Sequence, residues 1–221
     1  MIRVHVWCEH RQNKTQEDVL AVYPEFMHNT IANFLRKNED FTVTTGTLDD
    51  KDFGLSDEIL ENTDVCLWWG HIAHHEVPDE IAMKVKNRVL NGMGLIPLHS
   101  AHYSKPFKLL MGTTCSLRVI SHEKEILYAV MPGHPIAKGI EEGKIYVEIE
   151  EGYNEQFDIP QPDELVFIGS FDNCGLFRAG CAYTRGKGKV FYFQPGHETY
   201  PIFHDEQIQT VITNAVRWAA L

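Results

Sequence analysis

Histidine stands out in this chain for the chemistry that it can perform. The sequence has 12 histidines in 221 residues, and several come directly after short apolar segments that are typical of strands. Imidazole exchanges protons near neutral pH and binds transition metals, so histidines gathered at one place would serve acid–base catalysis or metal binding. The histidines concerned are His10, His71, His74, His99, His102 and His197.

Some of these histidines indicate a metal site. Neutral imidazoles from separate strand ends are donors that zinc accepts readily, and Glu151 or Glu198 would add a carboxylate. The sequence therefore predicts a divalent metal such as zinc as cofactor, and it indicates no nucleotide cofactor. The alternative is a hydrogen-bonded histidine cluster without a metal. The predicted metal ligands come from the set His71, His99, His102 and His197.

A different arrangement would use a serine nucleophile. Ser100 lies where a strand-to-helix nucleophile elbow belongs, although the flanking glycines of that motif are missing. His197 would then act as the base and Glu198 as the orienting acid. Across the two interpretations, the predicted catalytic residues are His99, Ser100, His197, Glu198 and Glu151.

Residues beside these histidines are predicted to bind the substrate. Trp69 adjoins Gly70 and would offer a flat apolar face to a sugar ring, although a tryptophan in a strand is more often part of the core. The acidic run 148–151 is normally a solvated edge, yet one member would be able to point into the site. The predicted substrate-binding residues are Glu9, His10, Trp69, Gly70, His74 and Tyr153.

The elements that must position these residues alternate between strands and helices. Apolar or β-branched segments predict strands at 3–7, 41–45, 64–70, 94–98, 165–170, 181–184 and 190–194. Helical patterns cover 15–37 with an interruption at Pro24, 78–91 and 205–221. The segment 115–149 reads as short strands and turns, as an insertion or a sheet edge. The pattern predicts one α/β domain over 1–221, a doubly wound, mostly parallel sheet flanked by helices. Ligands of such sheets bind beyond the carboxyl ends of the strands.

Composition narrows the classes of partner. The formal net charge of −11 argues against nucleic acid, which requires a basic surface. We expect no membrane association, because the chain has neither a long apolar span nor a basic amphipathic stretch. Five cysteines without a CxxC pair favour reduced thiols, and the start of the sequence has no room for a signal peptide. A cytoplasmic protein is therefore expected.

Four longer motifs carry a family resemblance. They read WWGHIAHHEV, LHSAHYSKPFKLLMGTTCSL, GHPIAKGI and FYFQPGHETYP, and together they resemble the trehalose-utilisation (ThuA-like) family over nearly the whole chain. The resemblance implies a flavodoxin-like fold of the class I glutamine amidotransferase-like type. It also relates Glu150–Tyr153 to an acidic-acidic-x-Tyr motif of the family, which supports Glu151 and Tyr153 as site residues. At Cys8 the chain differs from the more usual asparagine-containing form.

The resemblance to true amidotransferases is looser. Their elbow carries a nucleophilic cysteine, whereas this chain reads Leu98–His99–Ser100. Because imidazole or an unactivated hydroxyl does not simply replace a thiolate, glutaminase activity is not expected.

The resemblance implies a role in disaccharide utilisation, on a sugar or keto-sugar, through acid–base or metal-assisted chemistry. The alternatives are a non-catalytic carbohydrate-binding or regulatory protein, and a metal-dependent hydrolase of another small molecule. The expected partner is a small sugar, and the chain is open to homo-oligomer formation.

Overall fold

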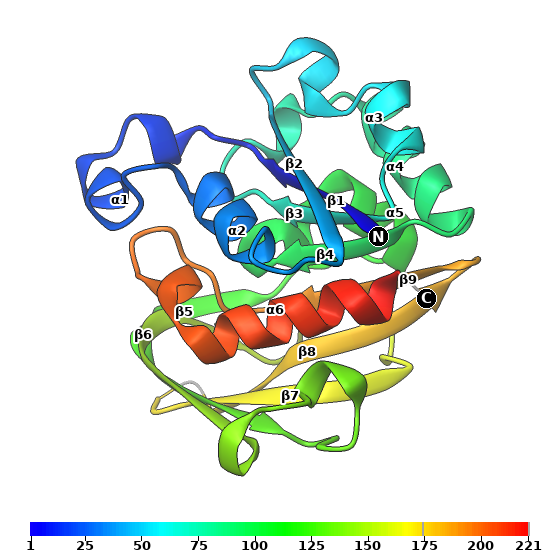
Figure 1. Ribbon diagram of the computed structural model, residues 1–221. Helices are drawn as coiled ribbons and strands as arrows, with labels where there is room; N and C mark the ends of the chain where they lie inside the picture. The colour runs from blue at the N-terminus through cyan, green and yellow to red at the C-terminus, as the bar shows by residue number, and fades with distance from the viewer. Residues whose placement is uncertain (174, 221) are drawn as a thin grey trace.

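A single nine-stranded sheet runs through the computed structural model, which describes residues 1–173 and 175–220. The strand order is β2-β1-β3-β4-β9-β8-β7-β5-β6. Four neighbouring pairs, from β2 to β9, are parallel, and the four pairs from β9 to β6 are antiparallel. The sheet is therefore mixed, with a parallel core, and Figure 1 shows the antiparallel strands gathered on one side of it.

The parallel half matches the sequence-based prediction closely. Its strands are β1 Ile2–Cys8, β2 Phe41–Thr47, β3 Val65–Trp69, β4 Gly94–Leu98 and β9 Gly188–Phe193. Every residue of β3 and β4 is buried, because helices cover both faces of a doubly wound sheet. The apolar runs that predicted these strands reflect that double coverage.

The antiparallel half is larger than the sequence indicated. It consists of β5 Arg118–Ala129, β6 Lys144–Asn154, β7 Glu164–Phe171 and β8 Gly175–Arg185. The prediction of short strands and turns over 115–149 was therefore wrong, although its edge position is confirmed by β6 at the end of the sheet. The irregular alternation has a physical cause, since register shifts interrupt the β5–β6 pairing and reverse which residues face outward.

Helices pack on both faces of the sheet. On one face lie α2 Met27–Leu35 and α6 Glu206–Ala219. On the other face α3 Asp57–Glu61, α4 Asp79–Leu90 and α5 Lys105–Met111 form a connected layer (Figure 1). The predicted interruption at Pro24 is confirmed, because α1 Glu17–Val22 ends before it and α2 begins after it. The α/β class is confirmed.

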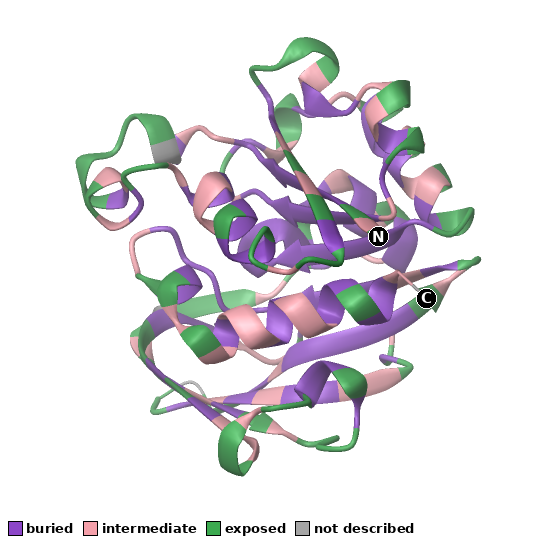
Figure 2. Cartoon of the chain, in the orientation of Figure 1, coloured by how far each residue is buried: buried purple, intermediate pink, exposed green. Residues whose placement is uncertain are grey.

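The core is continuous between these layers, as the buried residues in Figure 2 show. The rings of Trp7 and Trp68 lie 3.9 Å apart on neighbouring strands, and the final helix buries Ile208, Val211 and Trp218. Among the described residues, no helix combines the length and apolar composition needed to cross a bilayer.

Candidate metal and active site

The turn after β4 places His99 at the centre of the site. His99 is the first residue of the short 3-10 helix His99–Tyr103 and has a φ of 52°, which is uncommon for a residue with a side chain. Gly196 in the turn after β9 makes room for it, because a Cβ at Gly196 would lie 3.1 Å from His99 Cβ and 2.9 Å from Phe203. Such left-handed residues are concentrated at functional sites.

Three histidines from different strand ends meet here. Ring centroids lie 5.8 Å apart for His71 and His99, and 5.5 Å apart for His197 with each of the other two. Glu151 of β6 and Glu198 lie against them, so that His71, His197 and Glu198 form one group of close donor atoms and His99, Glu151 and His197 form another. These five residues are called the histidine centre below.

His99 is held with one nitrogen directed into the histidine centre. Its Nδ1–H donates to the backbone carbonyl of Gln194 at 2.9 Å, and its Nε2 lies 3.2 Å from Glu151 Oε2. Burial alone would lower the pKa of His99, but the neighbouring Glu151 carboxylate and further acidic groups outweigh it and raise that pKa to about 9. A carbonyl on the outer nitrogen is the arrangement that orients metal-binding histidines.

The carboxylates of the centre are kept ionised. Burial would raise the pKa of Glu151, but the His99 ring outweighs it and lowers that pKa to about 2. Glu198 likewise has a lowered pKa despite its burial, because His71 Nδ1 lies 2.9 Å from Glu198 Oε2. Gln12 donates to the other oxygen of Glu198 at 2.5 Å. By contrast, burial lowers the pKa of His197 to about 4, which favours a neutral imidazole.

Glu150 fixes the backbone of the turn after β9. It is fully buried and accepts backbone N–H bonds from Gly196 at 2.7 Å, His197 at 3.2 Å and Glu151 at 2.8 Å. Burial raises the pKa of Glu150 in spite of these bonds. Glu150 therefore positions His197 relative to β6.

Glu9 does the same for the loop after β3. Its two oxygens accept the backbone N–H groups of Ile72 at 2.8 Å and Ala73 at 3.0 Å. A Cβ at Gly70 would approach Glu9 to 3.1 Å, so glycine allows this contact. Burial raises the pKa of Glu9. Glu9 thus supports the segment that carries His71.

The structure does not assemble the serine triad. Ser100 Oγ pairs with Tyr153 Oη at 2.9 Å, and Glu198 pairs with His71. His197 Nδ1 instead lies 2.8 Å from Thr199 Oγ1. The left-handed elbow position belongs to His99, which leaves the Ser100 hydroxyl turned to Tyr153. Tyr153 Oη also lies 3.3 Å from His99 Nε2.

Two of the predicted histidines lie apart from the centre. His102 donates from Nδ1 to the Cys115 carbonyl at 2.7 Å among aromatic rings, and burial lowers its pKa to about 3. His102, a predicted metal ligand, therefore occupies a core position and belongs to neither group of close donor atoms among the described residues. His10 packs against Phe26 and His28, because its left-handed backbone turns it toward α2.

Two of the residues predicted to bind the sugar, Trp69 and His74, lie in other surroundings than expected. Trp69 is 1% exposed and donates to the Gly196 carbonyl at 3.0 Å, so no face of it is available to a sugar. His74 is half-buried beside Tyr103, and burial lowers its pKa to about 4.

Several residues of the site escaped the sequence-based prediction. Gln194 was missed because a polar residue next to a strand end carries no sign of its partner, and Glu150 was noted only as a member of the acidic run and of the family motif. His122 comes from β5, and its ring centroid lies 5.1 Å from that of His197. His122 lies opposite Glu151 in the pairing of β5 with β6. The sequence does not reveal that pairing, so it offered no signal for His122. The residues missed are Gln12, His122, Glu150, Gln194 and Tyr200.

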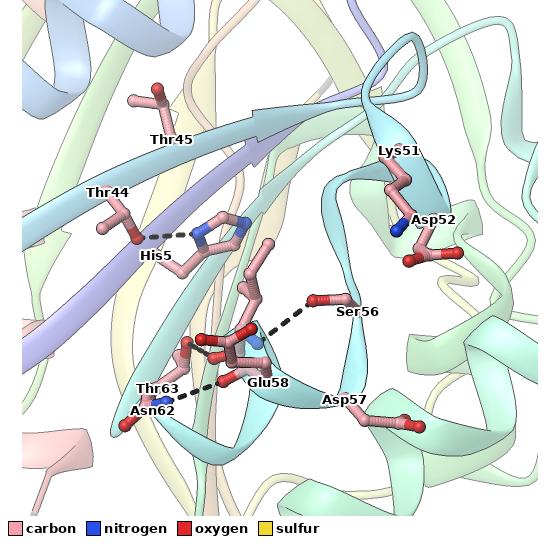
Figure 3. A pocket seen from close by; sticks show the side chains of 11 residues that line it. His5, Thr44, Thr45, Lys51, Asp52, Ser56, Asp57, Glu58, Asn62 and Thr63 are labelled. Carbon is pink, nitrogen blue, oxygen red and sulfur yellow. Dashed lines mark hydrogen bonds between the residues drawn. The ribbon is translucent and has the colours of Figure 1, made fainter.

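A cavity of 740 Å³ lies elsewhere, between β2 and α3 (Figure 3). Some of its polar groups are bonded locally: Ser56 accepts the Ile59 N–H, Thr63 donates to the Ile59 carbonyl, and His5 pairs with Thr44. The charged side chains Lys51, Asp52, Asp57 and Glu58 also line it, but His5 is the single histidine among its lining residues, so it lacks the cluster of imidazoles found at the histidine centre.

The donor set of the histidine centre fits a divalent cation. Glu151 Oε2 is buried and has no hydrogen-bond partner among the described residues, although it faces His99. Ligands bound at about 2.0–2.1 Å around one ion lie roughly 3 Å from each other. The His99–Glu151 and His71–Glu198 separations of 3.2 and 2.9 Å, one in each group of close donor atoms, are compatible with that spacing and equally with a direct contact between the two side chains of each pair.

The mixed sheet with its parallel core and the helices on both faces define a doubly wound α/β protein whose candidate site follows β4. The sequence profile of the ThuA family, described as trehalose utilisation, matches residues 3–219. The chain belongs to this family, as its motifs predicted. Comparison with curated proteins gives no significant sequence match.

Solved structures agree with this fold. A ThuA-like protein from Parabacteroides merdae has a TM-score of 0.73 at 14% identity, covering 99% of this chain and 90% of its own. A cytoplasmic protein from Salmonella typhimurium has a TM-score of 0.64 at 14% identity, covering 99% of both chains. A structure described as a GMP synthase protein from Thermoplasma acidophilum has a TM-score of 0.59 at 16% identity, covering 100% of this chain and 94% of its own.

Proposed function

We propose that this protein is a divalent-metal-dependent enzyme that acts on a sugar or keto-sugar during disaccharide utilisation. The observation that carries the proposal is the convergence of His71, His99 and His197 with two ionised carboxylates. Membership of the trehalose utilisation family supports the sugar class. A cation bound there would polarise a carbonyl or hydroxyl oxygen of the substrate.

The surrounding residues have distinct tasks in this proposal. Gln194 and Gln12 orient His99 and Glu198 from outside the centre. Glu151 would bind the cation through Oε2, which lies 3.2 Å from His99 Nε2. Because a histidine occupies the elbow, this chain has no thiolate there for glutamine hydrolysis.

A reducing cytoplasm is the proposed cellular setting. The described cysteines Cys66, Cys115 and Cys181 are buried and form no disulfide with one another, which suits such a compartment. Cys174 lies outside the described residues. The Salmonella typhimurium protein of similar fold is a cytoplasmic protein, and the net charge of −11 argues against nucleic acid as a partner.

Metal analysis and turnover together test the proposed function. Protein purified without chelators should contain about one zinc, manganese or similar ion per chain, or take it up on addition. Trehalose and its 3-keto derivative should then be turned over, and chelation should abolish turnover. Sugar binding without turnover would support the non-catalytic alternative, and a bound metal with no sugar binding would support a hydrolase of another small molecule. Absence of any stoichiometric metal would overturn the proposal.

A further inference from the structure

One further imidazole reaches the histidine centre from the antiparallel half of the sheet. The ring centroid of His122, on β5, lies 5.1 Å from that of His197 and 5.5 Å from that of Tyr200. His122 is exposed, whereas His197 is 7% exposed. His122 therefore stands on the solvent side of the centre.

The strand pairing explains why His122 points this way. His122 lies directly opposite Glu151 in the antiparallel pairing of β5 with β6. Directly opposed residues of such a pair extend to the same face of the sheet. The register shift just before His122 changes the alternation of β5 at this point, and bulges of this kind often redirect side chains beside active sites.

Tyr200 completes a wall beside His122. Its ring centroid lies 5.3 Å from that of His197, and the residue is half-buried. The backbone of Tyr200 is fixed on both sides: its N–H donates to the His197 carbonyl at 3.2 Å, and its carbonyl accepts the Tyr23 hydroxyl at 2.6 Å. The backbone that carries the Tyr200 ring is thus fixed on both sides.

We propose that His122 and Tyr200 form the subsite that binds the sugar ring on the solvent side of the histidine centre. This inference rests on the proposed function and adds the residues that recognise the substrate. Both side chains have a flat ring and a polar tip, the combination that packs on an apolar sugar face while hydrogen-bonding a hydroxyl. Trp69, the ring that sequence analysis favoured for this task, is buried.

His122 is assigned to substrate rather than to metal. It belongs to neither group of close donor atoms among the described residues, although His197 belongs to both. Its exposure also separates it from His99, which is fully buried. Removal of His122 should therefore leave metal binding unchanged.

The test compares His122→Ala and Tyr200→Leu with the native protein, after zinc loading. Calorimetric titration with trehalose and with 3-keto-trehalose measures sugar affinity, and elemental analysis measures zinc. Both variants should bind the better of the two sugars at least 10-fold more weakly and should keep native zinc content. His75→Ala is the matched control, because His75 is an exposed histidine outside the site, and it should bind both metal and sugar as the native protein does.

Other outcomes separate this inference from the proposed function. Native sugar affinity in both variants, or no sugar binding by the native protein, would overturn the subsite. Loss of zinc in His122→Ala would also overturn it, because His122 would then be a ligand. A native protein that binds sugar through His122 and Tyr200 but holds no metal would leave the subsite standing and refute the metal-dependent function.

Discussion

His71 and His102 have opposite surroundings, although both follow parallel strands. The His71 side chain is 23% exposed and faces Glu198, whereas His102 is enclosed by Tyr153, Phe157 and Tyr192. A partly exposed imidazole such as His71 is able to bind a ligand. A buried imidazole such as His102 takes the place of an apolar core residue and needs a hydrogen-bond partner within the protein.

This contrast predicts different zinc binding by two alanine variants. His71→Ala should lower zinc affinity by more than the roughly 10- to 100-fold that loss of an outer contact costs, and it should also lower the melting temperature, because the buried Glu198 carboxylate loses its imidazole partner. His102→Ala should keep zinc but lose about 2–4 kcal/mol of stability, because a packed ring and a buried hydrogen bond disappear. Calorimetric melting and zinc titration of both variants decide the matter; equal zinc loss in both would contradict the assignment.

The sequence predicts which histidines follow the strands of the parallel half, but not which of them belong to the site and which to the core. His71, His99 and His197 follow strands whose apolar runs are unmistakable, so their common edge could be predicted. Nothing in the sequence separates His102 from them, because its core position depends on aromatic residues far along the chain. The serine triad could be predicted for the same reason, because the partner of Ser100 lies far along the chain.

At the scale of elements, the turn after β9 depends on one glycine. Gly196 has a φ of 147°, a conformation that side chains rarely adopt, and its neighbours leave no room for a Cβ. The turn carries His197, so the backbone there must be correct for the histidine centre to form.

Gly196→Ala should therefore destabilise the protein by about 2–4 kcal/mol, from backbone strain and overpacking, and should weaken zinc binding. Gly133→Ala is the matched control, because nothing lies within 4 Å of a Cβ placed there, and its stability should be native within about 0.5 kcal/mol. Urea unfolding of both variants measures the difference. Equal stability of the two variants would show that the turn tolerates a side chain.

Strands β1 and β2 carry a histidine that links stability to pH. His5 Nε2–H donates to the Gly54 carbonyl at 3.0 Å, and its Nδ1 lies 2.9 Å from Thr44 Oγ1. Burial lowers the pKa of His5 from 6.5 to about 4. The folded state therefore keeps His5 neutral at pH values where the unfolded chain binds a proton.

Since the unfolded state takes up that proton first, the stability from this group is complete above pH 6.5 and is lost as the pH falls toward 4. His5 alone should reduce the unfolding free energy by about 2–3 kcal/mol between pH 7.5 and pH 4.5. His5→Gln should lower stability at both pH values while shrinking the difference between them by that amount. Urea unfolding at the two pH values gives both numbers, and an unchanged difference would mean that His5 is not the titrating group.

The elements themselves differ in how far sequence reveals them. Strands β3 and β4 are short, apolar and buried on both faces, so composition alone identifies them. Strands β5 and β6 lie at an edge, carry charged side chains such as Lys124 and Glu148 outward, and shift register. Pairing partners far apart in the chain decide that geometry, and no local pattern contains them.

At the scale of the whole molecule, the histidine centre joins the two halves of the sheet. His71, His99 and His197 follow strands of the parallel half, whereas Glu151 belongs to β6 at the antiparallel edge. A cation held by His99, His197 and Glu151, which form one of the two groups of close donor atoms, would bind only the folded chain with both halves in place. Metal binding and global stability should therefore be linked.

Zinc at about 100 times its dissociation constant should stabilise the folded protein by about 2.7 kcal/mol, which raises the melting temperature of a chain this long by roughly 5–10 °C. Glu151→Gln should lose most of this increase, because a neutral amide is a poorer ligand than a carboxylate. Glu148→Gln is the control on the same strand, since the Glu148 side chain is 86% exposed, and it should show the full increase. Melting curves with zinc and with excess chelator measure the shift for each protein. An equal shift in Glu151→Gln and Glu148→Gln would place the ion away from β6, and the two halves of the sheet would then not be joined through it.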